Sequence, residues 1–306
     1  MLPRIVLLGP HGQIGWELRR SLVPLGEVIP LDRAAVDLRD TDAVRDVMLQ
    51  TRPHAIVNAA AYTDVDGAES DRSAAFAVNA EAPRALAEAA AATGALLVHF
   101  STDYVFDGQA RRPYTESDDT APSSVYGQSK REGERAILGI MPDALIFRTS
   151  WIYGRRGRNF LRTMLRLARE RDELRVVNDQ IGAPTWSRAV AEAVTAILSR
   201  LATPAGFALP SGARGIHHLT AGGETSWYGF ACAILGGDPD ARLQRARSVV
   251  PVSTGEFPRA ASRPAYAVLD NGRVVRTFGV RLPHWSELLG LALAPEQPEA
   301  DTPARS

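Results

Sequence analysis

The sequence predicts an α/β protein in which a doubly wound parallel sheet is joined to a smaller, partly interleaved C-terminal lobe. Short apolar runs alternate with amphipathic stretches as far as residue 200, which is typical of strands and helices in βαβ units. A glycine-rich turn separates the first apolar run from the first amphipathic stretch. After residue 203 the alternation weakens and the loops lengthen. The first part is therefore expected to be a Rossmann-like domain, and the last part a separate lobe.

The bulk properties are those of an ordinary globular protein. The chain has 306 residues, 45% of them apolar, and a formal net charge of zero, which gives no sign of nucleic acid or a membrane as a partner. The single cysteine, Cys232, excludes an intrachain disulfide framework or a cysteine-cluster metal site. The N-terminal apolar run is too short for a signal peptide or a membrane span. We expect a cytoplasmic protein.

The first unit is an apolar strand at residues 4–8, a turn, and an amphipathic helix at about residues 16–25. Glycine lets the backbone approach a pyrophosphate closely, and the free N–H groups at a helix N-terminus favour anions. We therefore expect this turn to bind a dinucleotide, although its spacing is G-x-x-G-x-x-G. Its candidate cofactor residues are Gly9, Gly12, Gln13, Ile14 and Gly15.

The second strand, at residues 28–31, ends at an acidic residue, Asp32. An acid in this position normally accepts hydrogen bonds from the adenosine ribose hydroxyls. Arg33 follows directly, and an arginine there can accept a 2′-phosphate. Because the two signals conflict, we hypothesise that the protein uses both NADH and NADPH. Asp37 and Leu38 are placed to contact the adenine.

Two further strands are expected to line the cofactor and the reacting centre. The strand at residues 55–61 ends in small side chains that leave room for a flat cofactor, and a helix at residues 69–94 follows it. The next strand, at residues 96–103, ends in the polar run Ser101-Thr102-Asp103. Doubly wound sheets bind ligands at this carboxyl edge, where a hydroxyl can polarise a carbonyl group. His99 lies mid-strand, and we expect it to be buried and hydrogen-bonded.

Tyr126 and Lys130 are four residues apart and therefore lie on one face of a helix. Free tyrosine has a pKa of about 10, and a neighbouring ammonium lowers it. The pair is thus expected to donate a proton near neutral pH. Lys130 is the only lysine in the chain, and arginine cannot replace it as a compact point charge.

The remaining elements predict the division of the chain. A strand at residues 144–149, a helix at 159–170, a strand at 175–177 and a helix at 188–201 continue the alternation. We expect a dinucleotide-binding domain at residues 1–170, to which the helix at about 187–201 returns. A substrate lobe comprises about residues 171–186 and 203–294, and residues 295–306, rich in Pro, Glu and Ala, form a disordered tail. The lobe's Arg259 and Arg263 are candidate diphosphate ligands.

Taken together, these motifs resemble the extended short-chain dehydrogenase/reductases that act on sugar nucleotides. Longer strings are similar to the dTDP-4-dehydrorhamnose reductase family, over nearly the whole chain to about residue 293. These strings are HFSTDYVF at 99–106, RTSWIY at 148–153, NDQIGAPT at 178–185 and HLTAGG at 218–223. The resemblance implies NAD(P)H-dependent reduction of the C4 keto group of dTDP-4-dehydro-β-L-rhamnose, which gives dTDP-L-rhamnose for polysaccharide biosynthesis.

The resemblance also implies a role for each matching residue. Tyr126 would protonate the C4 oxygen, Lys130 would hold the nicotinamide ribose and lower the tyrosine pKa, and Thr102 would polarise the ketone. Asp103 and Trp151 match positions that contact the sugar. The other residues that match the cofactor shell are Gly12, Gln13, Ile14, Asp32, Asp37, Leu38, Ala61, Tyr62, Thr63 and Phe100.

The sequence differs from two related groups of proteins, the sugar-nucleotide dehydratases and the magnesium-bridged reductases. Sugar-nucleotide dehydratases carry Thr-Asp-Glu at the end of the fourth strand, whereas Tyr104 follows Asp103 here, so the base for eliminating water is missing. Some related reductases form dimers bridged by magnesium through carboxylates. Glu17 and Glu192 are candidates for such a bridge, but Arg188 places a cation there, so no metal ligand is assigned and magnesium stays uncertain. A homodimer remains open.

Two other functions remain open. The regulatory β-subunit of methionine adenosyltransferase resembles these reductases and keeps the Tyr-Lys spacing, so a non-catalytic, NADP-binding subunit is the main alternative. Trp151 and the loop at residues 178–180 favour a working sugar site over it. A 4-epimerase of the same superfamily would hold NAD⁺ tightly and make no net redox change. The sequence does not decide between dTDP and UDP as the carrier.

Overall fold

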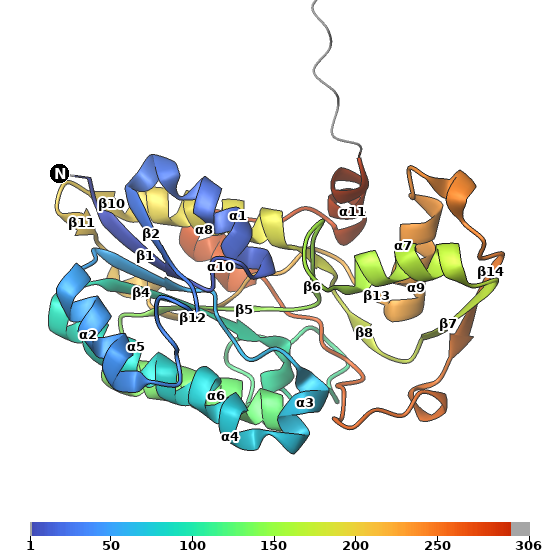
Figure 1. The fold of residues 1–306 in the computed structure, drawn as a ribbon, viewed down its shortest axis with the longest axis horizontal. Coiled ribbons are helices and arrows are strands. Elements are labelled where there is room, and N and C mark those ends of the chain that lie inside the picture. Colours follow the sequence, from blue (N-terminus) through green and yellow to red (C-terminus); the bar gives the residue numbers. More distant parts are fainter. Residues whose placement is uncertain (1, 295–306) are drawn as a thin grey trace, which may run out of the picture.

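Six parallel strands form the centre of the molecule (Figure 1). The structure, a computed structural model, describes residues 2–294, so the predicted tail at 295–306 lies outside the described residues. The strands are β1 (Arg4–Leu8), β2 (Glu27–Leu31), β3 (Ala55–Asn58), β4 (Leu96–Thr102), β5 (Leu145–Thr149) and β12 (Gly215–His218). Their order is β12-β5-β4-β3-β1-β2, so the chain leaves the middle of the sheet in both directions, as a doubly wound fold requires.

Helices cover both faces of this sheet (Figure 1). On one face α1 (Gln13–Ser21) packs against α8 (Ser187–Leu201), and α10 (Gly272–Phe278) packs on β12. On the other face α5 (Ala82–Thr93) lies between α2 (Thr41–Thr51) and α6 (Val125–Ile140). The predicted Rossmann-like α/β fold is therefore confirmed.

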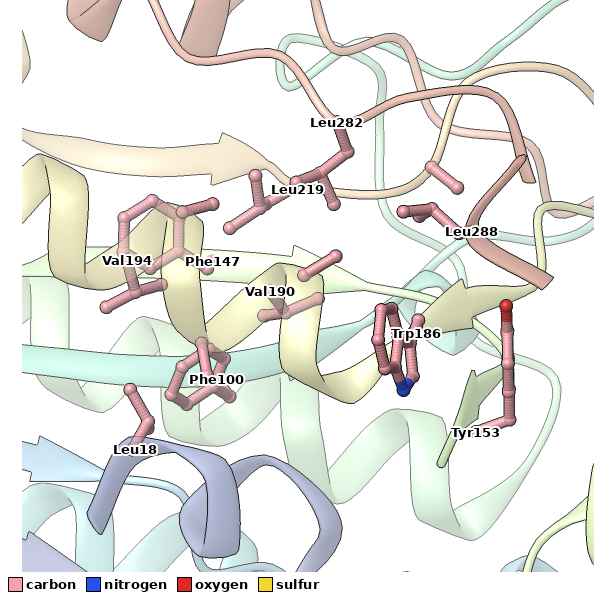
Figure 2. Packing of buried hydrophobic residues seen from close by; sticks show 14 of the residues in the cluster. Leu18, Phe100, Phe147, Tyr153, Trp186, Val190, Val194, Leu219, Leu282 and Leu288 are labelled. Carbon is pink, nitrogen blue, oxygen red and sulfur yellow. The ribbon is translucent and has the colours of Figure 1, made fainter. Parts of the chain in front are cut away.

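Each side of the sheet carries its own apolar core, because successive side chains of a strand point to opposite faces. Ile5, Leu7 and Phe100 belong to the cluster that faces α8, and Figure 2 shows Phe100 and Phe147 beside Val190 and Val194 of that helix. Val6 and Leu8 belong to the second cluster, on the face covered by α2 and α5. Burial on both faces explains why these strands are continuous apolar runs in the sequence.

The smaller part of the molecule lies beside the carboxyl ends of the sheet (Figure 1). Its helices are α7 (Phe160–Glu170), α9 (Trp227–Gly236) and α11 (Trp285–Leu293). Its strand pairs are β7 (Glu173–Val177) with β14 (Ser248–Val252), β8 (Ile181–Gly182) with β13 (Thr225–Ser226), and β6 (Ile152–Tyr153) with β9 (Thr185–Trp186). A separate hairpin, β10 (Ala202–Thr203) and β11 (Gly206–Phe207), follows α8. No described helix is long and apolar enough to cross a membrane.

Three predicted elements differ from the structure. The helix expected at about residues 16–25 begins earlier, as α1 at Gln13–Ser21, and a 3₁₀ turn follows at Val23–Leu25. The strand expected at residues 55–61 ends at Asn58, whose side chain accepts a hydrogen bond from the Ala60 N–H and turns the chain. The single helix expected at 69–94 is broken into α3 (Val65–Ser70), α4 (Arg72–Phe76), a π-helical turn (Ala77–Glu81) and α5. Asp71 caps α4, and Pro83 has no N–H for the carbonyl group of Asn79. Gly94, which caps the C-terminus of α5, is left-handed, with φ 73°.

Candidate active site

The glycine-rich turn forms a tight cradle between β1 and α1. Gly9 has a φ of +71°, and a Cβ on it would lie 2.7 Å from the backbone of Ala60. A Cβ on Gly15 would lie 2.1 Å from the carbonyl oxygen of Gly9. The N-terminus of α1, at Gly12, has no side-chain cap and no acidic residue in its first turn, so its N–H groups are available to an anion. These features fit the pyrophosphate of a dinucleotide.

Gly15→Ala is expected to weaken NADPH binding at least about tenfold, because the new methyl group must displace the Gly9 carbonyl. Gly139→Ala, on α6, is the matched control, since its added Cβ would meet nothing within 4 Å. Fluorescence titration of NADPH into both folded variants measures the effect. An unchanged dissociation constant in Gly15→Ala would remove this turn from the cofactor site.

The polar residues after β2 are already organised by hydrogen bonds. One carboxylate oxygen of Asp32 accepts from the backbone N–H groups of Ala34 and Ala35 at 3.0 Å, and the other lies 3.2 Å from Nε2 of His11. These contacts, chiefly the one from Ala35, hold the pKa of Asp32 below its usual value. The Arg33 side chain is 75% exposed and lies 3.8 Å from a carboxylate oxygen of Asp37. A carboxylate and an exposed guanidinium therefore follow each other directly at the end of β2.

Asp37 forms an ion pair with a second arginine, Arg39, and is not free to contact the adenine. The side chain of Arg39 donates to it, and this contact lowers the pKa of Asp37 to about 2. Leu38 packs against the cluster that β1 and α2 share. Gln13 also makes internal contacts: it donates to the carbonyl oxygen of Ile152 at 3.3 Å, and it accepts from Asn159 at 3.0 Å. It therefore ties the glycine turn to the segment that carries β6 and α7.

The segment Ala61-Tyr62-Thr63, which follows β3, is held by Asn79. The Tyr62 N–H donates to Asn79 Oδ1 at 2.9 Å, and Asn79 Nδ2 donates to the Tyr62 carbonyl at 3.0 Å. The same amide nitrogen donates to Ser129 Oγ on α6 at 3.0 Å. The π-helical turn thus fixes the distance between the predicted cofactor segment and the Tyr126 helix. In the sequence only its polarity among alanines marks Asn79.

Tyr126 and Lys130 occupy the first turns of α6, which begins after the capping residue Ser124. Ser124 Oγ accepts from the Gly127 N–H at 3.1 Å. Lys130 is 2% exposed, and its Nζ donates to the carbonyl oxygen of Phe100 at 2.7 Å. Burial lowers the pKa of Lys130 to about 8, and the charge of Glu134 opposes that shift.

Thr102 and Asp103 meet Tyr126 at the carboxyl end of β4. Burial raises the pKa of Tyr126 to about 12, and the neighbouring Thr102 hydroxyl opposes the rise. The expectation that Lys130 lowers the pKa of Tyr126 below 10 is wrong, because desolvation of the phenolate dominates. Tyr126 therefore keeps its proton at neutral pH and can act as a donor.

Asp103 has an unused acceptor in this site. Thr102 Oγ1 donates to Asp103 Oδ1 at 2.8 Å, whereas Oδ2 has no hydrogen-bond partner among the described residues. Asp103 is 2% exposed, and burial raises its pKa to about 7. A buried carboxyl group with a free oxygen suits a hydroxyl-bearing ligand.

The side of the site away from the sheet is aromatic. Trp151 has a φ of +47° and stacks on Trp227, with 3.5 Å between ring centroids and 5° between ring planes. A Cβ on Gly182 would lie 2.4 Å from the Trp151 ring, so this glycine makes room for the indole. A strained backbone whose side chain is held by close packing is typical of a functional position. The sequence predicted Trp151 but missed Trp227.

A cavity of about 470 Å³ opens beside this tryptophan pair. Aromatic and arginine side chains share its wall: Tyr104, Phe160, Trp227, Phe257, Arg171, Arg175, Arg259 and Arg263. Both terminal guanidinium nitrogens of Arg263 donate to Asp66 of α3 at 2.8 Å. The Arg259 guanidinium lies 4.7 Å from the Phe257 ring centroid. Such a wall suits a flat base and a diphosphate.

Glu17 and Arg188, which bear on the magnesium question, form an ion pair within the chain. Arg188 Nε donates to Glu17 Oε2 at 3.0 Å, and Glu17 is only 12% exposed. Among residues 2–294 there is no cluster of three or more histidine, cysteine, aspartate or glutamate side chains that could hold a metal ion.

A glycine cradle on β1, a Thr-Tyr-Lys group at the end of β4 and a separate nucleotide-sized cavity define a class of protein, the sugar-nucleotide oxidoreductases of the short-chain dehydrogenase/reductase type. The comparisons with known proteins make this more specific. Residues 3–297 match the family model described as the RmlD substrate binding domain. The chain therefore belongs to the dTDP-4-dehydrorhamnose reductase family.

Individual relatives agree with this assignment. The chain is 46% identical over 294 residues to the dTDP-4-dehydrorhamnose reductase of Burkholderia thailandensis. This alignment covers 95% of this chain and 98% of that protein. The solved reductase from Clostridium acetobutylicum superposes with a TM-score of 0.86 at 37% identity, over 95% of this chain and 98% of that one. The Bacillus anthracis reductase, solved in complex with NADP, superposes with a TM-score of 0.84 at 36% identity, over 95% of this chain and 99% of that one.

Proposed function

We propose that this protein reduces the C4 keto group of dTDP-4-dehydro-β-L-rhamnose to give dTDP-L-rhamnose, with NADPH or NADH as the reductant. The observation that carries the proposal is the convergence of Thr102, Tyr126 and Lys130 at one sheet edge, in a chain of this family. The family membership favours an enzyme over the non-catalytic regulatory subunit, since the named relatives are reductases.

Each residue of this group has a separate role in the proposed reaction. The bound nicotinamide supplies the hydride, which adds to C4 of the sugar. The Thr102 hydroxyl would turn its proton from Asp103 to the C4 carbonyl and so polarise the ketone. Tyr126 gives its proton to the C4 oxygen, so that the ketone becomes an alcohol. Lys130 binds the nicotinamide ribose and stabilises the phenolate that remains on Tyr126.

The substrate contacts follow from the geometry around this group. We assign the free oxygen of Asp103 to a sugar hydroxyl and the Trp151 indole to a face of the sugar ring. The neighbouring cavity would take the nucleotide, with its base between aromatic side chains. Arg259 is then the diphosphate ligand, whereas Arg263 is held by Asp66 and shapes the cavity wall.

For the cofactor, we propose the predicted shell of Gly9, Gly12, Gln13, Ile14, Gly15, Asp32, Arg33, Asp37, Leu38, Ala61, Tyr62, Thr63, Phe100, Tyr126 and Lys130. Arg33→Ala is expected to raise the KM for NADPH about tenfold and to leave the KM for NADH within about twofold, because only NADPH carries a 2′-phosphate. Arg135→Ala is the control, since that side chain is similarly exposed but lies on α6. Equal changes for both cofactors would show that Arg33 does not read the 2′-phosphate.

The proposed function is tested by the loss of nicotinamide absorbance when the purified protein meets dTDP-4-dehydrorhamnose, with NADPH and NADH in separate reactions. Substrate-dependent oxidation of either cofactor supports the reductase. Cofactor binding without oxidation would favour the regulatory subunit. Conversion of the sugar with no net change in cofactor would favour a 4-epimerase.

Three broader points also stand as proposals. We propose a smaller lobe that includes α7, because α7 packs against α9 and β7, whereas β12 and α10 belong to the large sheet. The predicted boundary at residue 170 would instead place α7 in the dinucleotide-binding domain, so the two divisions of the chain are alternatives. We likewise propose a cytoplasmic location and a homodimer. Light scattering at several protein concentrations would measure the oligomeric state.

A further inference from the structure

A chain of buried polar side chains runs behind the proposed catalytic group and ends on Lys130. Asn58, the last residue of β3, and His99, in β4, are 0% and 1% exposed. Asn58 Nδ2 lies 3.1 Å from His99 Nδ1, and His99 Nε2 lies 3.2 Å from Lys130 Nζ. Nothing in the proposed reaction uses Asn58 or His99 directly, yet every polar atom of the two side chains has a hydrogen-bond partner.

The backbone decides which atom Asn58 presents to the histidine. Asn58 Oδ1 accepts a hydrogen bond from the Ala60 N–H at 3.1 Å, so the amide nitrogen is the atom that faces the imidazole. An amide nitrogen only donates. His99 Nδ1 must therefore accept, and a neutral imidazole that accepts at Nδ1 carries its proton on Nε2.

The Nε2–H of this tautomer points at Lys130 Nζ. Only a free amine can accept it, because an ammonium group has three donors and no lone pair. An ammonium on Lys130 requires the other tautomer, with the proton on Nδ1. Asn58 must then turn its oxygen toward Nδ1, and the Ala60 N–H loses its partner.

We propose that Asn58 and His99 couple the charge of Lys130 to the tautomer of His99, so that His99 is a positioning residue for Lys130. The free amine goes with the Nε2–H tautomer, and the ammonium goes with the Nδ1–H tautomer. This inference rests on the proposed function for its catalytic meaning, because Lys130 would act on Tyr126 as an ammonium. The coupling itself belongs to the protein without substrate.

The other groups that face Lys130 and His99 do not account for the charge of Lys130 or the tautomer of His99. On α6, Glu134 faces Lys130, but its carboxylate is already held by two hydrogen bonds from Arg148. Tyr126 is uncharged at neutral pH. On β5, the residue paired with His99 is the apolar Ile146. Burial holds the pKa of His99 well below its usual value, so its ring stays neutral while Lys130 titrates.

The test is ¹⁵N NMR of the full chain labelled at histidine, without substrate, from about pH 6.5 to about pH 9.5, a range that brackets the Lys130 pKa of about 8. The chain has six histidines, and His99→Gln identifies the His99 signals by their loss. The expected result is a change from the Nδ1–H to the Nε2–H tautomer as the pH rises. One tautomer throughout the range would overturn the proposal.

Asn58→Asp supplies a second, independent variant. The carboxylate has the same shape, keeps the Ala60 contact and only accepts hydrogen bonds, so it holds the proton on Nδ1. We expect the tautomer change to move upward by about one pH unit or more. Ser101→Ala, on the same strand, is the control that should leave it unmoved. An unshifted transition in Asn58→Asp would contradict the coupling.

These measurements separate the coupling from the enzymatic proposal. If the wild type shows the tautomer change but oxidises no cofactor with substrate, the coupling stands and the proposed function fails. If turnover is present, the pH profile of kcat should move in the same direction in Asn58→Asp as the NMR transition does. If Asn58→Asp moves the NMR transition but leaves the pH profile of kcat in place, the charge of Lys130 does not control the rate.

Discussion

Replacing Tyr126 by phenylalanine is expected to lower kcat for the NADPH-dependent reduction at least about 100-fold, because the C4 oxygen loses its proton donor. NADPH should still bind with nearly unchanged affinity, since the glycine cradle and Lys130 remain in place. Stopped-flow measurement of cofactor oxidation, together with a fluorescence titration, gives the two quantities separately.

Tyr153→Phe is the matched control for this experiment. Tyr153 is also buried, and its hydroxyl has no hydrogen-bond partner among residues 2–294, so removing the oxygen should change kcat little. A Tyr126→Phe protein that turns over as fast as Tyr153→Phe would show that another group donates the proton. Loss of cofactor binding in Tyr126→Phe would instead indicate a structural role for the side chain.

The largest expected effect on stability comes from Glu134→Ala. Glu134 on α6 and Arg148 on β5 form a two-armed ion pair at 2.8 and 2.7 Å, and each side chain is only 3% exposed. Removing the carboxylate leaves a buried guanidinium without its anion, which costs about 3–5 kcal/mol of unfolding free energy. The guanidinium would still lie 5.0 Å from the Phe106 ring centroid, a contact that does not replace the lost anion.

Glu132→Ala, two residues earlier on the same helix, is the control for charge and helix propensity. Its ion pair with Arg135 is 3.9 Å long and exposed, so the expected change is below about 1 kcal/mol. Urea unfolding followed by circular dichroism compares both variants with the wild type. Equal losses in the two would mean that burial does not set the strength of the Glu134–Arg148 pair.

The sequence predicted the sheet well because its signals are local. Apolar runs that end in Gly9, Asp32 or Thr102 mark strands whose carboxyl ends meet at one edge, and the structure has β1, β2 and β4 in those places. Tyr126 and Lys130 were predicted from their spacing and from the uniqueness of the lysine. These are properties of a few neighbouring residues, which one sequence displays directly.

What the sequence could not predict depends on contacts between distant residues. Asp66 and Arg263 are 197 positions apart and form a bidentate pair, and Trp227 stacks on Trp151 although the two residues are far apart in the sequence. The pKa of Tyr126 went the other way from the prediction, because a motif shows a neighbouring lysine but not the surrounding burial. The sequence also did not show the π-helical turn that places Asn79, because the alanine-rich helical pattern continues through it.

The most direct test of the proposed chemistry is the transfer of deuterium from NADPH that carries deuterium at both hydrogen positions of the nicotinamide C4. Purified protein, labelled cofactor and dTDP-4-dehydrorhamnose are combined, and the sugar product is analysed by NMR and mass spectrometry. The proposed function predicts one deuterium, bound at C4 of dTDP-rhamnose, in an amount equal to the cofactor oxidised. A product without label at C4, or cofactor oxidation without a labelled sugar, would contradict it.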